Sequence, residues 1–91
     1  MKSASLKLRL YVAGGAPNSL RAIANIEAIC AEHFASSHSL EVVDLLKNPQ
    51  RGVDDQIIVT PTLLKLSPKP TGRVIGTLTD VQQVLSILVG R

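Results

Sequence analysis

The sequence predicts a single α/β domain, in which a strand–helix–strand half is followed by a short helix, a strand hairpin and a last helix. Three observations predict this fold. Apolar residues alternate from Leu6 to Val12, recur at helical spacing from Leu20 to Phe34, and return in short β-branched runs after residue 40. The chain of 91 residues is 45% apolar and 19% charged, which suits one compact unit and is too short for two cores.

The first predicted strand runs from Leu6 to Val12. Every second residue is aliphatic, and the residues between them are Lys7, Arg9 and Tyr11. This period of two is typical of a strand with one buried face. The strand opens a β-α-β unit over residues 6–46, whose crossover is expected to be right-handed.

A turn and an amphipathic helix follow this strand. Two glycines and Pro17 form the turn, and Asn18 or Ser19 is expected to accept a hydrogen bond from the first free N–H groups of the helix. The helix is predicted to end near Ala35. Its apolar stripe comprises Leu20, Ile23, Ile26, Cys30 and Phe34.

The C-terminal half carries weaker patterns. A second strand, Leu40–Leu46, precedes a short helix that begins near Asn48 and Pro49 and leads into a loop. Residues 60–66 and 73–76 are interpreted as an antiparallel hairpin. Thr79 and Gln82 have the spacing of a capping box for a last helix over residues 79–89. The apolar stripe of that helix comprises Val81, Val84, Leu85 and Leu88.

This order of elements is that of the thioredoxin-like fold. In that fold the first turn normally carries a Cys-x-x-Cys pair at the start of the helix, and a proline with a cis peptide bond faces it. Here the turn is Ala-Pro-Asn-Ser, the facing proline is expected to be Pro61, and Gly14 and Gly15 are assigned structural roles. The sequence therefore predicts the architecture without its thiol chemistry.

The residues that could carry chemistry do not form a catalytic or metal-binding set. The single cysteine, Cys30, lies on the apolar helix stripe, where packing is favoured over the alternative of a one-cysteine redox enzyme. His33 and His38 lack the further ligands of a metal site, and Asp54 and Asp55 would diverge on a helix. We therefore expect no catalytic residue, no metal and no cofactor.

Charge and composition favour a protein-binding module. The formal net charge is +3, but the basic residues are dispersed and only Tyr11 and Phe34 are aromatic, which disfavours nucleic-acid binding. Residues 1–15 lack the apolar run of a signal peptide, and no run approaches the ~18 apolar residues of a membrane span. We expect a cytoplasmic protein with neither nucleic acid nor membrane as a partner.

Four long, nearly ungapped blocks match a known family: LYVAGGAPNSLRA, VVDLLKNPQ, TPTLLKL and RVIGTLTD. They resemble the KaiB family of cyanobacterial circadian-clock proteins and their bacterial homologues over about residues 6–85. The resemblance implies a non-enzymatic partner of a KaiC-type ATPase ring, with a KaiA-type protein or a competing histidine kinase as further partners. It also implies two folds, a ground state that forms homo-oligomers (dimer or tetramer) and a thioredoxin-like monomer that is the binding form.

The resemblance also implies a partner-binding surface. The second strand would lie at a sheet edge that can accept a partner strand, and the residues after it would form a polar rim. The residues assigned to partner binding are Arg21, Glu41, Lys47, Asn48, Gln50, Arg51, Asp55 and Arg73. The alternative function is a stand-alone thioredoxin-like adaptor or sensor without redox activity, similar to the input domain of the clock-associated histidine kinase.

Several positions depart from the cyanobacterial pattern. Ile87 and Val89 align with a glycine and an aspartate of the family, and Glu41 and Gln56 align with lysines. The sequence also ends at Arg91, where cyanobacterial members continue into an acidic tail. Glycine in a helix interior costs about 0.8–1.0 kcal/mol relative to alanine. We therefore expect Ile87 and Val89 to shift the fold balance toward the thioredoxin-like form.

Overall fold

A computed structural model of the chain describes residues 6–90. The first five residues, part of the segment assessed for a signal peptide, and Arg91 lie outside the described residues. The elements in chain order are β1 (Leu6–Val12), α1 (Pro17–His33), β2 (His38–Asp44), α2 (Pro49–Asp54), β3 (Thr62–Ser67), β4 (Gly72–Ile75) and α3 (Val81–Leu88). This order confirms the predicted α/β plan.

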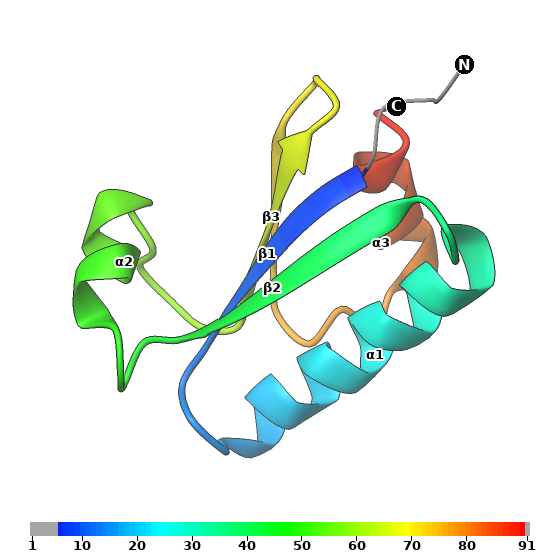
Figure 1. Ribbon diagram of the computed structural model, residues 1–91. Coiled ribbons are helices and arrows are strands. Elements are labelled where there is room, and N and C mark those ends of the chain that lie inside the picture. The colour runs from blue at the N-terminus through cyan, green and yellow to red at the C-terminus, as the bar shows by residue number, and fades with distance from the viewer. Residues whose placement is uncertain (1–5, 91) are drawn as a thin grey trace.

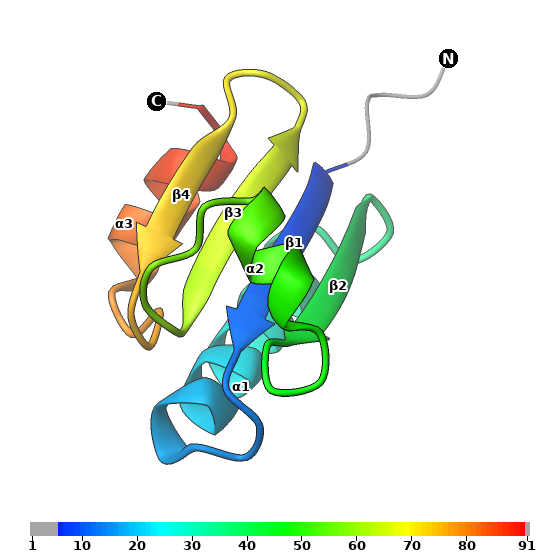
Figure 2. The same cartoon turned by 90° about the vertical axis from the view of Figure 1, so that its left-hand side faces the viewer.

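A four-stranded sheet in the order β2-β1-β3-β4 forms the middle layer (Figure 1). β1 is parallel to β2 and antiparallel to β3, and β4 is antiparallel to β3. α1 and α3 cover one face, whereas the short α2 lies over part of the other (Figure 2). β2 is therefore an edge strand, as the sequence predicts.

The main core lies between the sheet and the helices α1 and α3. The aliphatic side of β1 is almost inaccessible, with Leu8 at 2% and Leu10 at 0% exposure. Ile26 of α1 and both Val84 and Leu88 of α3 belong to the same cluster. Because full burial of an aliphatic side chain contributes roughly 1.5–3 kcal/mol, this cluster is the principal apolar contact of the fold.

A second, smaller apolar cluster lies beneath α2. It contains Tyr11, Val43 and Leu64, with Leu45 and Ile57 packed against them. Tyr11 is fully buried. The prediction that β1 buries only one face is therefore wrong at its C-terminal end, because α2 covers the second face there.

Helix α1 starts at Pro17, and the side-chain cap predicted at Asn18 or Ser19 is wrong. Instead, the Ser19 hydroxyl accepts a hydrogen bond from the Ala13 amide at 3.0 Å. The buried face is also rotated from the predicted stripe, because Leu20 is 54% exposed whereas Ser19 is buried. The Ser19 hydroxyl thus joins the turn after β1 to the first turn of α1.

The turns at the ends of β1 and β2 are joined by Asp44. β2 begins at His38, earlier than predicted, and ends at Asp44. One carboxylate oxygen of Asp44 accepts hydrogen bonds from the Gly14 and Leu46 amides, each at 2.9 Å. Gly14 has φ +55, and a Cβ there would lie 2.9 Å from the Leu46 side chain, whereas a Cβ on Gly15 would meet nothing within 4 Å. The backbone therefore needs glycine at the first of these positions.

Helix α2 confirms the short helix predicted near Asn48 and Pro49. Its close approach to the chain after β2 depends on Gly52, where a Cβ would lie 2.8 Å from the Leu45 side chain. Glycine disfavours a helix interior by its propensity. At this position the low helix propensity of glycine is tolerated, because a larger residue would prevent the contact between α2 and Leu45.

The predicted hairpin is formed by β3 and β4. Thr62 pairs with Ile75 at one end, and Lys65 pairs with Gly72 at the other. The Thr60–Pro61 peptide bond is cis, as are the bonds that precede Pro68 and Pro70 in the connecting turn.

Helix α3 is shorter than predicted. Its N-cap is Asp80, whose carboxylate accepts a hydrogen bond from the Gln83 amide at 3.1 Å. The capping box predicted at Thr79 and Gln82 is therefore wrong. Val81 is 41% exposed and does not belong to the buried stripe, because it lies in the first turn, away from the sheet.

The two positions assigned to the fold balance lie in different surroundings. Ile87 packs against the main core. Its Cγ2 lies close to Gly72, and a Cβ added to Gly72 would be only 2.8 Å from it. Val89 is the C-cap of α3 and is 51% exposed. Ile87 therefore adds packing to the docked helix, whereas Val89 adds little.

We expect Ile87→Gly to lower the free energy of unfolding by about 2–4 kcal/mol, because both packing on Gly72 and helix propensity are lost. Urea unfolding followed by circular dichroism measures this change. Gln83→Gly, at an exposed helical position, is the matched control and should cost only about 1 kcal/mol. Equal losses in the two variants would contradict the packing role of Ile87.

Candidate functional site

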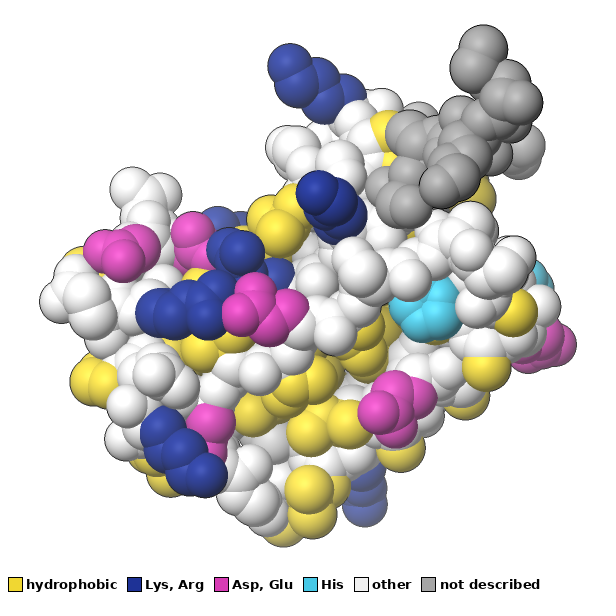
Figure 3. All heavy atoms as spheres, viewed as in Figure 1, with side chains coloured by type: hydrophobic (Ala, Val, Ile, Leu, Met, Phe, Trp, Pro, Cys, Tyr) yellow, Lys and Arg dark blue, Asp and Glu magenta, His cyan; other side chains and the backbone are white. Residues whose placement is uncertain are grey.

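Several predicted partner-binding residues gather where α2 meets the sheet. Glu41 of β2, Arg51 of α2 and Arg9 of β1 form the centre, and Asp55 and Tyr11 extend it. We call these five residues the polar cluster. Figure 3 shows basic and acidic side chains interleaved around α2 and the neighbouring part of β2.

Glu41 bridges two arginines. Its Oε2 and Oε1 accept from Arg51 Nη1 at 2.7 Å and Nη2 at 3.0 Å, and Oε1 also accepts from Arg9 Nε at 2.8 Å. The Arg51 contact is a two-pronged guanidinium–carboxylate pair, a strong and directional arrangement. Hydrogen bonds from Arg51 and then Arg9 lower the pKa of Glu41 from 4.5 to about 2. The carboxylate is therefore ionised at neutral pH.

Asp55 joins the end of α2 to β1. Its carboxylate accepts hydrogen bonds from Arg9 Nη1 at 2.9 Å and from the Tyr11 hydroxyl, which also lies 3.1 Å from the Arg51 carbonyl oxygen. The Tyr11 hydrogen bond is the main cause of the lowered pKa of Asp55. Burial is the main cause of the raised pKa of Tyr11. A neutral phenol therefore donates to an ionised carboxylate.

Arg73 holds the chain that leaves α2. From β4 its Nη2 and Nη1 donate to the backbone carbonyls of Asp55 at 3.0 Å and Gln56 at 3.1 Å. Gln56 has φ +56, which is uncommon for a residue other than glycine. Arg73 therefore stabilises a backbone turn that links the polar cluster to the far edge of the sheet.

The eight predicted partner-binding residues divide into three groups. Four are engaged by contacts within the chain, namely Glu41, Arg51, Asp55 and Arg73. Lys47, Asn48 and Gln50 are exposed at the turn before α2 and on its first turn, although Gln50 Nε2 donates to Asp54 at 3.0 Å. Arg21 is exposed on α1, across the sheet from α2 (Figure 2). The structure thus brings most of this set to α2 and leaves Arg21 apart.

Arg9 and Tyr11 are the cluster members that sequence reasoning missed. The period of two assigns both to the side of β1 away from the aliphatic residues, without a partner. In the parallel pairing of β1 and β2, Arg9 lies opposite Glu41. Opposite charges directly across two strands stabilise a sheet, so this pairing was the signal that could have found Arg9. Tyr11 lies opposite Val43 and had no such signal.

Reactive groups elsewhere remain separate from one another. Cys30 is fully buried in the main core, and burial raises the pKa of its thiol. His38 Nδ1 lies 2.7 Å from the Phe34 carbonyl oxygen, whereas His33 Nε2 lies 3.9 Å from Glu32. Within residues 6–90, no three His, Cys, Asp or Glu side chains are placed to hold a metal.

No helix in that range has the length and apolar character needed to cross a membrane.

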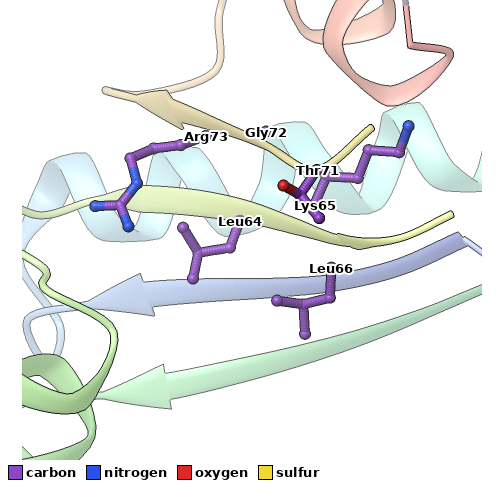
Figure 4. Close-up of a pocket in the computed structure, with 6 residues that line it drawn as sticks. All are labelled: Leu64, Lys65, Leu66, Thr71, Gly72 and Arg73. Carbon is purple, nitrogen blue, oxygen red and sulfur yellow. The ribbon is translucent and has the colours of Figure 1, made fainter. Parts of the chain in front are cut away.

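An open hollow of about 390 Å³ lies along the β3–β4 hairpin. Figure 4 shows Leu64 and Leu66 pointing to one side of β3, while Lys65 extends toward the end of α3. The charged residues among its described lining are Lys65 and Arg73, both basic. Two cationic side chains of this kind suit the binding of an anionic group.

A family model described as the KaiB domain matches residues 9–89 of the chain. The chain belongs to the KaiB family. It is 47% identical over 78 residues to the circadian clock oscillator protein KaiB of Microcystis aeruginosa. This match covers 86% of this chain and 75% of that protein. It is also 47% identical to the KaiB of a Prochlorococcus marinus strain, over 86% of this chain and 67% of that one. The KaiB resemblance of the sequence blocks is confirmed.

Solved structures confirm the thioredoxin-like fold of this KaiB-family chain. The N-terminal domain of Synechococcus elongatus SasA matches with a TM-score of 0.78 and 29% identity, over 98% of this chain and 88% of that one. Thioredoxin from Fasciola hepatica matches with a TM-score of 0.76, over 98% and 84% of the two chains. At 14% identity, the second match concerns the fold alone.

We expect Glu41→Gln to lower the free energy of unfolding at pH 7 by about 1 kcal/mol, a value reduced for solvent screening because Glu41 is half-exposed. The folded-state pKa is about 2 against an ordinary 4.5. The contribution of Glu41 is therefore fully present above pH 4.5 and disappears as the pH falls toward 2. Urea unfolding across this range should show a shallower pH dependence in the variant.

Glu27→Gln, on the exposed side of α1, is the control for this experiment. It should leave both the stability and its acid dependence unchanged. If the two variants behave alike, the ion pairs of Glu41 do not stabilise the fold. Asp55 also has a lowered pKa, so part of the acid dependence should remain in Glu41→Gln.

Proposed function

We propose that this KaiB-family chain is a non-enzymatic regulator that binds a KaiC-type ATPase ring in the cytoplasm. The observation that carries the proposal is the family match over residues 9–89, together with 47% identity to proteins named circadian clock oscillator protein KaiB. The thioredoxin-like fold supports it, because the family resemblance implies that this form binds the ring.

The proposed ring-binding surface is the outer side of the chain from Leu46 to Val53. Lys47, Asn48 and Gln50 supply its polar groups, while Leu46 and Val53 are 73% and 69% exposed. Large apolar side chains with a polar rim are typical of protein-binding surfaces. The polar cluster beneath holds this segment in place, so less ordering is needed when a partner binds.

The edge strand β2 supports a second mode of contact. Its outer backbone groups are not paired within the sheet, since β2 is the terminal strand. Val42 is 42% exposed on the side of β2 that faces α1, and Leu40 is partly buried there. Figure 3 shows hydrophobic side chains gathered between β2 and α1. A strand from the ring or from a KaiA-type protein would find both backbone and apolar contacts here.

A stand-alone adaptor or sensor is the second candidate. It is favoured by the match to the SasA N-terminal domain, which covers 98% of this chain. Identity is 47% to KaiB proteins and 29% to SasA, which favours the regulator. An adaptor would keep the thioredoxin-like fold alone, whereas a KaiB regulator would exchange with a second fold. Exchange spectroscopy by NMR distinguishes the two.

We expect Lys47→Glu to weaken binding to the KaiC-type ATPase of the same organism by about tenfold, equivalent to ~1.4 kcal/mol. The side chain is exposed and forms no part of the polar cluster, so the melting temperature should not change. Biolayer interferometry on the immobilised ring measures the affinity. Lys7→Glu, an exposed position at the end of β1 that α2 does not cover (Figure 2), is the control, and an equal loss there would place the contact elsewhere.

We expect Cys30 to be unreactive in the native protein, because its thiol is fully buried and burial raises its pKa. A colorimetric disulfide reagent should label it only in concentrated guanidinium chloride. Insulin reduction should not exceed the buffer rate, since resolving a mixed disulfide requires a second thiol. Rapid labelling of the native protein would support the redox alternative instead.

A further inference from the structure

The C-terminal ends of α1 and α3 and the start of the β3–β4 turn surround a second hollow, of about 230 Å³. Its described lining includes Phe34 and Val89, which are the C-caps of α1 and α3. Lys65 and Lys69 also line it. This hollow lies on the main-core side of the sheet, across from the polar cluster and from the proposed ring-binding surface.

Lys65 is the unusual residue of this hollow. It is only 2% exposed, and it pairs with Leu8 of β1, whose side chain belongs to the main core. Its side chain extends toward the end of α3 (Figure 4). There the Lys65 Nζ lies near Gly90, 3.7 Å from the position that a Cβ on this glycine would take. Among the described residues, no carboxylate forms an ion pair with Lys65. No buried side-chain nitrogen of the described residues lacks a hydrogen-bond partner, so the Lys65 ammonium itself faces the solvent within the hollow, where a ligand can reach it.

The charges around the hollow leave a positive excess. The ammonium groups of Lys65 and Lys69 bring two positive charges, and no described Asp or Glu lines the hollow. The C-terminal ends of α1 and α3 each supply roughly half a negative charge. Among the described residues the balance is about +1, which one monovalent anion would meet.

The remaining wall selects for an apolar group attached to that anion. The apolar side chains of Leu6, Phe34 and Leu88 also line the hollow. The volume of about 230 Å³ is below the ~300–1,000 Å³ of pockets for drug-sized ligands. At roughly 30 Å³ for each water-sized group, it accommodates about eight such groups.

We propose that this hollow binds a short-chain monocarboxylate. The carboxylate lies on the Lys65 ammonium near the end of α3, and the tail lies against Leu6, Phe34 and Leu88. Such a ligand joins the ends of α1 and α3 to β1 and β3. Because it binds only the folded hollow, it stabilises the thioredoxin-like form by mass action.

The test is a titration of the ¹⁵N-labelled full chain with hexanoate at pH 7, followed by amide chemical shifts. We expect saturable shifts at Phe34, Lys65 and Leu88, and none with hexylammonium, which has the same tail and the opposite charge. Lys65→Met should weaken hexanoate binding at least tenfold. Lys7→Met is the matched control, because Lys7 is exposed on the opposite side of the adjacent strand, and it should bind as the natural sequence does.

If Lys65→Met does not fold, Lys69→Met serves the same purpose, because Lys69 is exposed and lines the hollow. We expect it to weaken hexanoate binding severalfold. Three results would overturn the proposal: no saturable shift with the natural sequence, equal binding of hexanoate and hexylammonium, or unchanged affinity in the folded lysine variants. The ATPase ring takes no part in the titration, so its outcome is independent of the ring-binding proposal.

Discussion

Burial of both faces of β1 toward its C-terminal end is the constraint on which the other layers depend. One face presents Leu8 and Leu10 to the main core, and the other presents Arg9 and Tyr11 to the polar cluster. The strand also pairs with β2 and β3 on its two sides, which satisfies backbone groups that would be costly to bury alone. Helix α1 therefore packs on one side of this strand and α2 on the other, whereas α3 also depends on its contact with β4.

The fold was predictable because its main signals are local. A period of two in β1 and spacings of three and four in α1 identify these elements without knowledge of their neighbours. The errors occur where neighbouring residues compete for the same hydrogen-bonding role. Ser19 bonds the Ala13 amide instead of capping the helix, and Asp80 replaces Thr79 as the cap of α3. Propensity alone does not distinguish between adjacent residues that can all cap a helix.

The site was predictable only in part. The family blocks direct attention to Glu41, Arg51, Asp55 and Arg73. They do not indicate that Glu41 pairs with Arg51, that Asp55 pairs with Arg9, or that Arg73 binds the backbone that follows α2. That arrangement depends on the pairing of Arg9 with Glu41 across two strands separated by a helix, and on the close contact of Gly52 with Leu45. Neither feature has a local pattern in the sequence, because both depend on how distant segments meet.

The arrangement of the strands has a consequence for how the chain folds. Leu8 pairs with Leu40 on one side and with the much more distant Lys65 on the other. Contacts between distant residues form slowly, because a long loop must close before they contribute any stability. The N-terminal half can therefore assemble while one side of β1 is still unpaired.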